Sequence, residues 1–225
     1  MSHHFQVLLE VGPKGRKVVA VAPDWPGLER GAKTEEAAAK VLLPYLPRYA
    51  PVARLAGLGE EFSTITGVDV VGTYPGVGST DFWGISFAFS DIDHAEMSNA
   101  ELERELTLMQ AGWAFFDEVR SRVTAELAKG QRGSDKTRDQ VVRHTIHAEF
   151  DMAKKVGVAI PEARPVTEDI LQAYRDEYIT RIRLFHAEGK RARKWPLRYL
   201  IRHTAYHSIN HAWEMEDKDL TDPQS

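Results

Sequence analysis

The chain has 225 residues and a formal net charge of -4 at pH 7, with 43% hydrophobic and 28% charged residues. This composition is typical of a globular protein with one large domain or two small ones, and the negative charge argues against a general nucleic-acid binder. The complete absence of cysteine excludes disulfides, thiolate metal ligands and a cysteine nucleophile, so any metal ion would be held by histidine, carboxylates and water.

The first segment of the chain is expected to form a β-hairpin followed by a helix. Residues 5–9 and 17–22 are rich in β-forming side chains and flank a Gly-Pro-Lys-Gly turn at 12–15. Thr34 precedes two glutamates and can cap a helix over residues 35–46, because acidic side chains suit the positive end of a helix.

A second short helix is predicted near residues 49–58, and two further strands at 62–71 and 82–89, with a loop between them. We therefore interpret residues 1–95 as one small α/β domain. At its end, Asp91, Asp93 and His94 have metal-ligand chemistry, but the sequence favours a solvated loop for them.

This first unit resembles the HicB-like antitoxin fold over roughly its first 58 residues. The resemblance rests on the turn Ala22-Pro-Asp-Trp-Pro-Gly27 and on the helix start Lys33-Thr-Glu-Glu-Ala37. It implies an interaction module built from a strand pair, a rigid turn and a helix.

From Ser98 onward the hydrophobic residues recur at helical spacing. Ser98 can cap a helix, with Glu101 three residues later as its capping-box partner. Four long helices are expected: 98–127, 139–156, 167–188 and one that starts at Pro196. Short connections between long helices predict an antiparallel four-helix bundle over residues 96–225, whose core is a common place for a metal site. The predicted fold class is thus α+β, an α/β unit followed by a bundle.

Three histidines recur every fourth residue on the last predicted helix, at His203, His207 and His211. Residues four apart lie on one face of a helix, so two such imidazoles can bind one ion at about 2.0–2.1 Å. His203 and His211 lie roughly 12 Å apart along the axis, at 1.5 Å per residue, so all three cannot easily converge. His207 therefore belongs to either pair, and a further ligand has to come from another part of the chain.

Residues 98–220 resemble the DinB/YfiT-like superfamily of metal-binding four-helix bundles. In that family a His-x-x-x-His pair on the final helix binds the metal, often with one more histidine four residues earlier. Read in this way, His207 and His211 are the pair and His203 is the additional residue. The resemblance places the third ligand on the second helix at His144, five residues before Glu149, with His147 as the alternative.

The sequence departs from many members of that family after the last histidine, where it has Ala212-Trp-Glu214. Some proteins of the superfamily are S-transferases or isomerases that use low-molecular-weight thiols, and others are known only to bind metal. The resemblance therefore implies a divalent-metal site and, with less detail, a small-molecule substrate such as a thiol.

Zinc and nickel suit a site made of imidazoles, and the spacing does not choose between them. Three protein ligands leave a position for water or substrate, which fits a metal-dependent S-transferase or hydrolase. Glu149, Glu214 and Glu216 are candidates to orient an imidazole through its other nitrogen. Glu149 and Glu214 are also the only candidates, both weak ones, for a catalytic role.

Six basic residues and no acidic one occupy positions 190–202: Lys190, Arg191, Arg193, Lys194, Arg198 and Arg202. Cations at a helix start oppose the helix dipole, so this run either lies in a solvated loop, which we favour, or attracts an anionic substrate or nucleic acid. Few aromatic residues accompany the run, which weakens the nucleic-acid alternative.

A second alternative to the enzyme is a non-enzymatic binding protein with a structural metal. We expect a homodimer and, because no apolar run of about 20 residues or signal-peptide core is present, a cytoplasmic protein without membrane contact.

Overall fold

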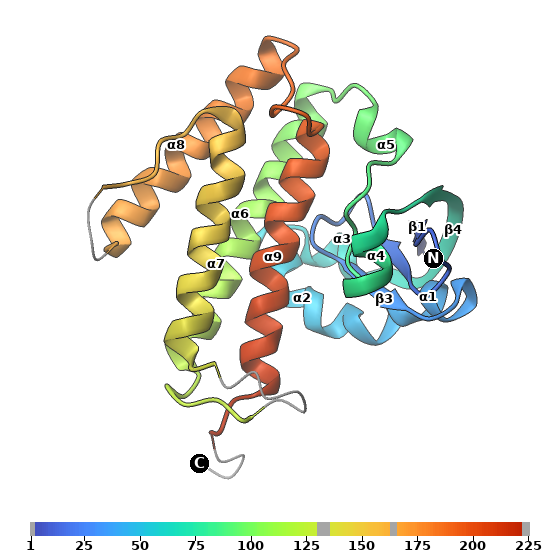
Figure 1. Cartoon of the computed structure of the whole chain (residues 1–225), viewed down its shortest axis with the longest axis horizontal. Coiled ribbons are helices and arrows are strands. Elements are labelled where there is room, and N and C mark those ends of the chain that lie inside the picture. Colours follow the sequence, from blue (N-terminus) through green and yellow to red (C-terminus); the bar gives the residue numbers. More distant parts are fainter. Residues whose placement is uncertain (1–2, 130–135, 163–165, 222–225) are drawn as a thin grey trace.

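The computed structural model describes residues 3–129, 136–162 and 166–221, and these form a mixed α+β fold. A four-stranded sheet from the first part of the chain lies beside long helices from the second part (Figure 1). The buried side chains of the sheet and of the helices belong to one continuous hydrophobic core.

The sheet contains β1 (His3–Val11), β2 (Val18–Val21), β3 (Glu29–Ala32) and β4 (Ile65–Pro75) in the order β3-β2-β1-β4. β1 and β2 pair antiparallel with Val11 opposite Val18, which confirms the predicted hairpin. β4 runs parallel to β1 at the other edge, and the helices between β3 and β4 make the crossover that a parallel pair requires.

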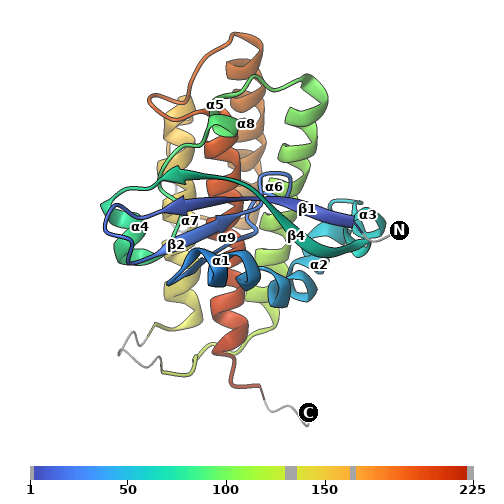
Figure 2. The ribbon, with the colours of Figure 1, turned by 90° about the vertical axis from the view of Figure 1, so that its right-hand side faces the viewer.

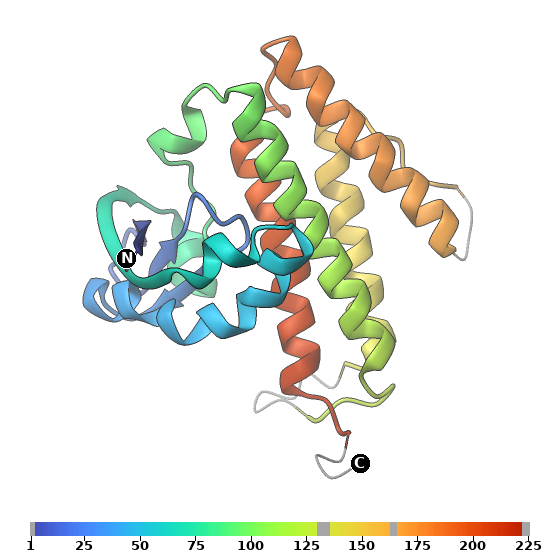
Figure 3. The ribbon, with the colours of Figure 1, turned by 180° about the vertical axis from the view of Figure 1, so that it is seen from behind.

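The crossover consists of α1 (Glu35–Val41), a 3₁₀ turn at Leu43–Tyr45, α2 (Leu46–Leu55) and α3 (Gly59–Ser63). The Thr34 hydroxyl accepts a hydrogen bond from the Ala37 backbone N–H, as expected for the cap of α1. Figure 3 shows α2 lying against α6 (Asn99–Arg122) on the far side of the molecule.

The prediction of a strand at residues 82–89 is wrong. Phe82 and Trp83 end a short helix, α4 (Gly78–Trp83), and the residues after it form no regular element. The backbone N–H groups of Phe87 and Ala88, which a strand would use for pairing, donate instead to the buried Glu10 carboxylate. The strand expected at residues 62–71 is present as β4, although Phe62 itself belongs to α3. Strand β3 was not predicted, because its sequence is largely polar.

The four predicted long helices are present as α6, α7 (Arg138–Ala153), α8 (Glu168–Ala187) and α9 (Leu197–Asp217). Ser98, Thr137 and Thr167 cap the first three through side-chain oxygens that accept backbone N–H bonds. α6 ends at Arg122 and does not reach residue 127, because the Asp219 carboxylate accepts from the Thr124 backbone N–H and hydroxyl.

The directions of these helices correct the expected antiparallel order. α6 and α9 run the same way: Arg198 pairs with Glu105 near one end, and Arg122 with Glu216 near the other. α7 and α8 also run parallel to each other (Figure 1): Arg175 of α8 pairs with Glu149 of α7, and further along Arg181 donates to the Gly157 carbonyl just beyond α7. The helices are therefore antiparallel across α6–α7 and α7–α9, but not across α7–α8.

Helix α9 is the central element of the molecule. It lies behind the sheet in Figure 2, between α6 and α7, and most of its residues are buried. The turn before β3 approaches it closely at Gly27, whose φ of 91° favours glycine and where a Cβ atom would lie 2.6 Å from Ile209 Cδ1. The Pro-Gly turn noted in the sequence therefore allows the sheet to pack on α9.

Arg202 joins α9 to the sheet through a buried charge network. Its Nε and Nη2 donate to the two carboxylate oxygens of Asp93 at 2.7 and 2.9 Å, and its Nη1 donates to Glu29 at 3.3 Å. Burial opposes ionisation of Asp93, but the guanidinium and the hydrogen bonds from Ser90 together lower its pKa, whereas at Glu29 burial dominates and raises the pKa to about 7. Asp93, in the short helix α5 (Asp91–His94), is thus 4% exposed and ion-paired, which corrects the expected solvated loop.

Replacing Arg202 with methionine is expected to lower the free energy of unfolding by about 3–5 kcal/mol, because it leaves buried carboxylates without a counter-charge. The measurement is denaturant unfolding at pH 7. The matched control is Arg183→Met, which removes an ion pair to Glu103 whose two side chains are 48% and 51% exposed, and about 1 kcal/mol or less is expected there. Equal losses in the two variants would contradict a special role for Arg202.

Candidate metal centre

The structure brings His144, His207 and His211 together. His144 projects from α7 and the other two from α9, and one ring nitrogen of each lies within 4.8 Å of the others. From this spacing three imidazoles can converge on one ion at about 2.0–2.1 Å. The group arises because α7 and α9 are antiparallel neighbours and because residues four apart share a face of α9.

His207 is partly buried in this group, and its Nδ1 is shielded from solvent. Burial lowers its pKa to about 2, so it is neutral near pH 7, which is the form that binds a metal. Its Nδ1 is buried and has no hydrogen-bond partner among the described residues. A buried polar atom without a partner is unfavourable, and a bound ion or an associated water would satisfy it.

His211 is held by Glu214, one turn further along α9. The His211 Nδ1 lies 2.8 Å from the Glu214 carboxylate, which leaves Nε2 as the ligand atom. The hydrogen bond from His211 is the main cause that lowers the Glu214 pKa to about 2, and Lys218 also binds this carboxylate at 2.6 Å. Glu214 therefore lies where the sequence analysis expected an orienting carboxylate.

The other two glutamates do not contact this group. Glu149 is 1% exposed, and both of its oxygens accept hydrogen bonds from Arg175 of α8. Glu216 binds Arg48 and Arg122. The expectation that Glu149 orients an imidazole is therefore wrong. The residue faces the contact between α7 and α8, where its carboxylate pairs with Arg175.

The two alternative ligands also lie outside the three-histidine group. His147 is exposed on α7, with its ring 6.2 Å from that of Phe150. His203 is buried and stacked on Tyr199, with ring centroids 5.2 Å apart. Burial and the neighbouring Arg202 cation lower the pKa of His203 to about 3, so this histidine is a neutral core residue near pH 7.

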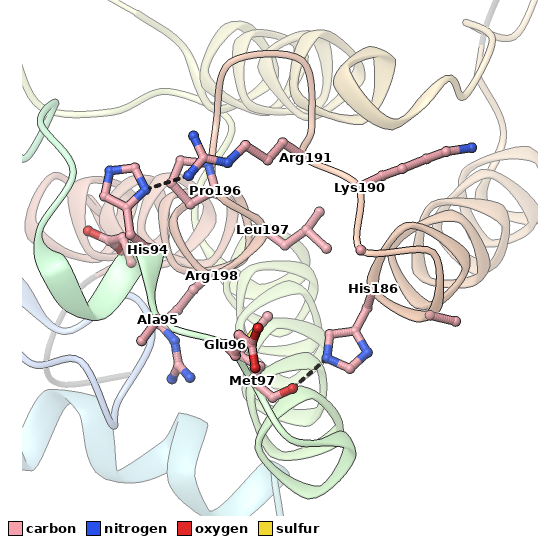
Figure 4. A pocket seen from close by; sticks show the side chains of 13 residues that line it. His94, Ala95, Glu96, Met97, His186, Lys190, Arg191, Pro196, Leu197 and Arg198 are labelled. Carbon is pink, nitrogen blue, oxygen red and sulfur yellow. Dashed lines mark hydrogen bonds between the residues drawn. The ribbon is translucent and has the colours of Figure 1, made fainter.

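The basic run at residues 190–202 is not a uniformly solvated segment. Arg198 and Arg202 are buried, and they pair with Glu105 of α6 and with Asp93. These ion pairs join α9 to other elements, which explains why two cations lie near the helix start, where the helix dipole disfavours them. The residues nearer α8 line a cavity of about 420 Å³ (Figure 4). There Arg191 points to His94, whose Nδ1 lies 3.0 Å from Nη2, while Lys190 points away from the cavity and pairs with Glu188.

His94 therefore pairs with a cation and joins no metal group with Asp91 and Asp93 among the described residues. None of the described helices is both long and apolar enough to cross a membrane.

Comparison with family models, with curated proteins and with solved structures found no match to this chain. The resemblances to the HicB-like and DinB/YfiT-like families stay predictions from short motifs.

Replacing His203 with glutamine is expected to flatten the acid side of the pH–stability profile. Between pH 6.5 and about 3 the unfolded chain binds a proton at His203 that the folded chain does not. Stability of the native protein therefore falls as the pH falls through this window, by up to about 1.4 kcal/mol per pH unit. Thermal unfolding from pH 7 to 4 in the presence of a chelator measures it. His147→Gln, at an exposed site, is expected to keep the native profile; a native profile in the His203 variant would contradict the assignment.

Proposed function

We propose that this protein binds one divalent metal ion, zinc or nickel, through His144, His207 and His211. The observation that carries the proposal is the convergence of three imidazoles from two helices, one of which, His207, has a buried nitrogen without a partner among the described residues. Imidazole ligands suit zinc and nickel, and no cysteine competes for the ion.

We further propose that the ion serves a reaction on a small molecule, as a metal-dependent thiol S-transferase or hydrolase. Three protein ligands leave a coordination position open, and the exposed side chain of His144 gives that position access to solvent. A divalent ion there supplies Lewis-acid chemistry, since it activates a water molecule or a substrate thiol. A low-molecular-weight thiol is the substrate class that the resemblance to the DinB/YfiT-like superfamily implies.

The chain's own residues would set up this chemistry. Glu214 fixes the tautomer of His211 by accepting from its Nδ1, so that Nε2 faces the ion. Burial keeps His207 neutral, and the antiparallel packing of α7 on α9 positions His144. The paired Arg198 and Arg202 leave less free charge for nucleic acid than the sequence suggested, so nucleic-acid binding is not the function we favour.

Protein purified without an affinity tag is expected to contain about one zinc or nickel ion per chain by elemental analysis. His207→Ala is expected to lose at least 90% of it, on the order of the effect of removing one of three ligands. His147→Ala, which changes an exposed histidine of α7 outside the group, is the matched control and is expected to keep the metal. No metal in the native protein, even after incubation with either ion, would overturn the site.

The open coordination position is tested with the cobalt(II)-substituted protein. Adding mercaptoacetate is expected to produce a saturable sulfur-to-cobalt charge-transfer band, because the thiolate enters the free position. His207→Ala treated with the same cobalt and then freed of unbound ion is expected to give no saturable band. A spectrum of the native protein that does not change with thiol would mean a closed, structural metal, and the protein would then be a binding module.

A further inference from the structure

A second cavity of about 420 Å³ lies on the other side of α9, between that helix, β3 and α2. Its lining includes Arg30, Tyr45, Trp83, Tyr206, Asn210 and Trp213. Tyr206 and Asn210 each directly precede a histidine of the metal centre, and consecutive helical residues point about 100° apart. The cavity therefore faces the sheet, whereas His207 and His211 face α7.

Arg30 is the cation in this cavity that has no acidic partner. Its Nη1 donates to the Glu29 carbonyl at 2.8 Å and weakly to the Asn210 side chain at 3.4 Å. Its side chain also interacts with that of Tyr45, and no described carboxylate lies within ion-pair distance of it. The two other cations of the lining are both paired, Arg48 with Asp217 at 2.9 Å and Lys218 with Glu214 at 2.6 Å.

The guanidinium of Arg30 is fixed between two aromatic rings. Its central carbon lies 4.1 Å from the centroid of Tyr45 and 4.3 Å from that of Trp213. Cation–π contacts of this kind offset part of the cost of partial burial. Burial still lowers the pKa of this guanidinium. The Arg30 guanidinium is thus held in place, partly shielded from water, and it lines the cavity. These are the features of a pre-organised anion site.

Tyr206 supplies a second, independent donor. This residue is 6% exposed, and it lines the cavity beside Arg30. Because Tyr206 lines the cavity, its hydroxyl can donate to a ligand there.

We propose that this cavity binds a small aromatic monocarboxylate, with its carboxylate on Arg30 and the Tyr206 hydroxyl and its ring against Trp83. The planar guanidinium of arginine can form two parallel hydrogen bonds with a carboxylate. Trp83, which is 64% exposed, adds an apolar surface at the rim of the cavity. The lining holds three cations (Arg30, Arg48, Lys218) and two carboxylates (Glu214, Asp217), so one positive charge remains. A monoanion balances that charge, whereas a phosphate dianion would be repelled by the two carboxylates. The volume lies in the range of small-molecule sites.

This site does not depend on the metal centre, although Glu214 borders both. Benzoate is the probe, and its binding to the native protein is followed by calorimetry and by tryptophan fluorescence. We expect saturable binding of one benzoate per chain. Arg30→Gln is expected to weaken it at least tenfold through loss of a charge-assisted bond pair. Arg54→Gln, at an exposed arginine of α2, is the matched control and is expected to bind benzoate as the native protein does.

Two further arms keep the test decisive if Arg30→Gln fails to fold. Tyr206→Phe removes one hydroxyl and is expected to weaken benzoate binding about three- to tenfold. Benzamide, a neutral analogue of the same shape, is expected to bind at least tenfold more weakly than benzoate. The proposal is overturned if benzoate does not saturate at about 10 mM, if benzamide binds equally well, or if both variants that fold bind benzoate normally. Stronger binding of inorganic phosphate than of benzoate would also overturn it.

Discussion

The buried ion pair between Arg202 and Asp93 is the constraint on which the rest of the structure depends. Two opposite charges can be buried without a large loss of stability only if they are close together and hydrogen-bonded. Arg202 satisfies this condition, since it donates two hydrogen bonds to Asp93 and one to Glu29. These partners lie on α5 and β3, so the pair fixes how α9 is rotated relative to the sheet. A different rotation would leave three buried charges unpaired, and this restricts α9 to one orientation.

The orientation of α9 determines what its other residues can do. His207 and His211 point to α7, where they meet His144, while Tyr206, Asn210 and Trp213 point to the cavity beside β3. Ile209 packs at Gly112 of α6, and Thr204 bonds with Tyr178 of α8. One helix thus provides a three-histidine group that could hold a metal ion on one face and lines the cavity around Arg30 with the next. Because both faces belong to one rigid helix, neither site can shift without the other.

The environments of the charged residues were the feature that the sequence predicted least well, for one physical reason. The sequence shows a carboxylate or a cation, but not whether an opposite charge lies beside it in space. Glu149 seemed close to His144 along α7, yet it binds Arg175 from α8. Arg198 and Arg202 seemed part of a solvated basic run, yet each is buried against a carboxylate distant in sequence. Burial of these groups requires partners that only the packing of several helices can provide.

The sequence by itself indicated the long helices, the hairpin and the shared helix face of His203, His207 and His211, since periodicity, caps and turn residues act over a few positions. The resemblance to the DinB/YfiT-like superfamily, and not the spacing, singled out His144 with the pair His207 and His211, and Glu214 was one of three candidate glutamates. Only the tertiary structure decided that α7 and α8 run parallel, that residues 82–89 form no strand, and that His203 and His147 lie outside the group. These features depend on contacts between residues far apart in the chain, and local patterns carry no information about which of those contacts form. The cavity around Arg30 is of the same kind, because its walls come from β3, α2, α4 and α9.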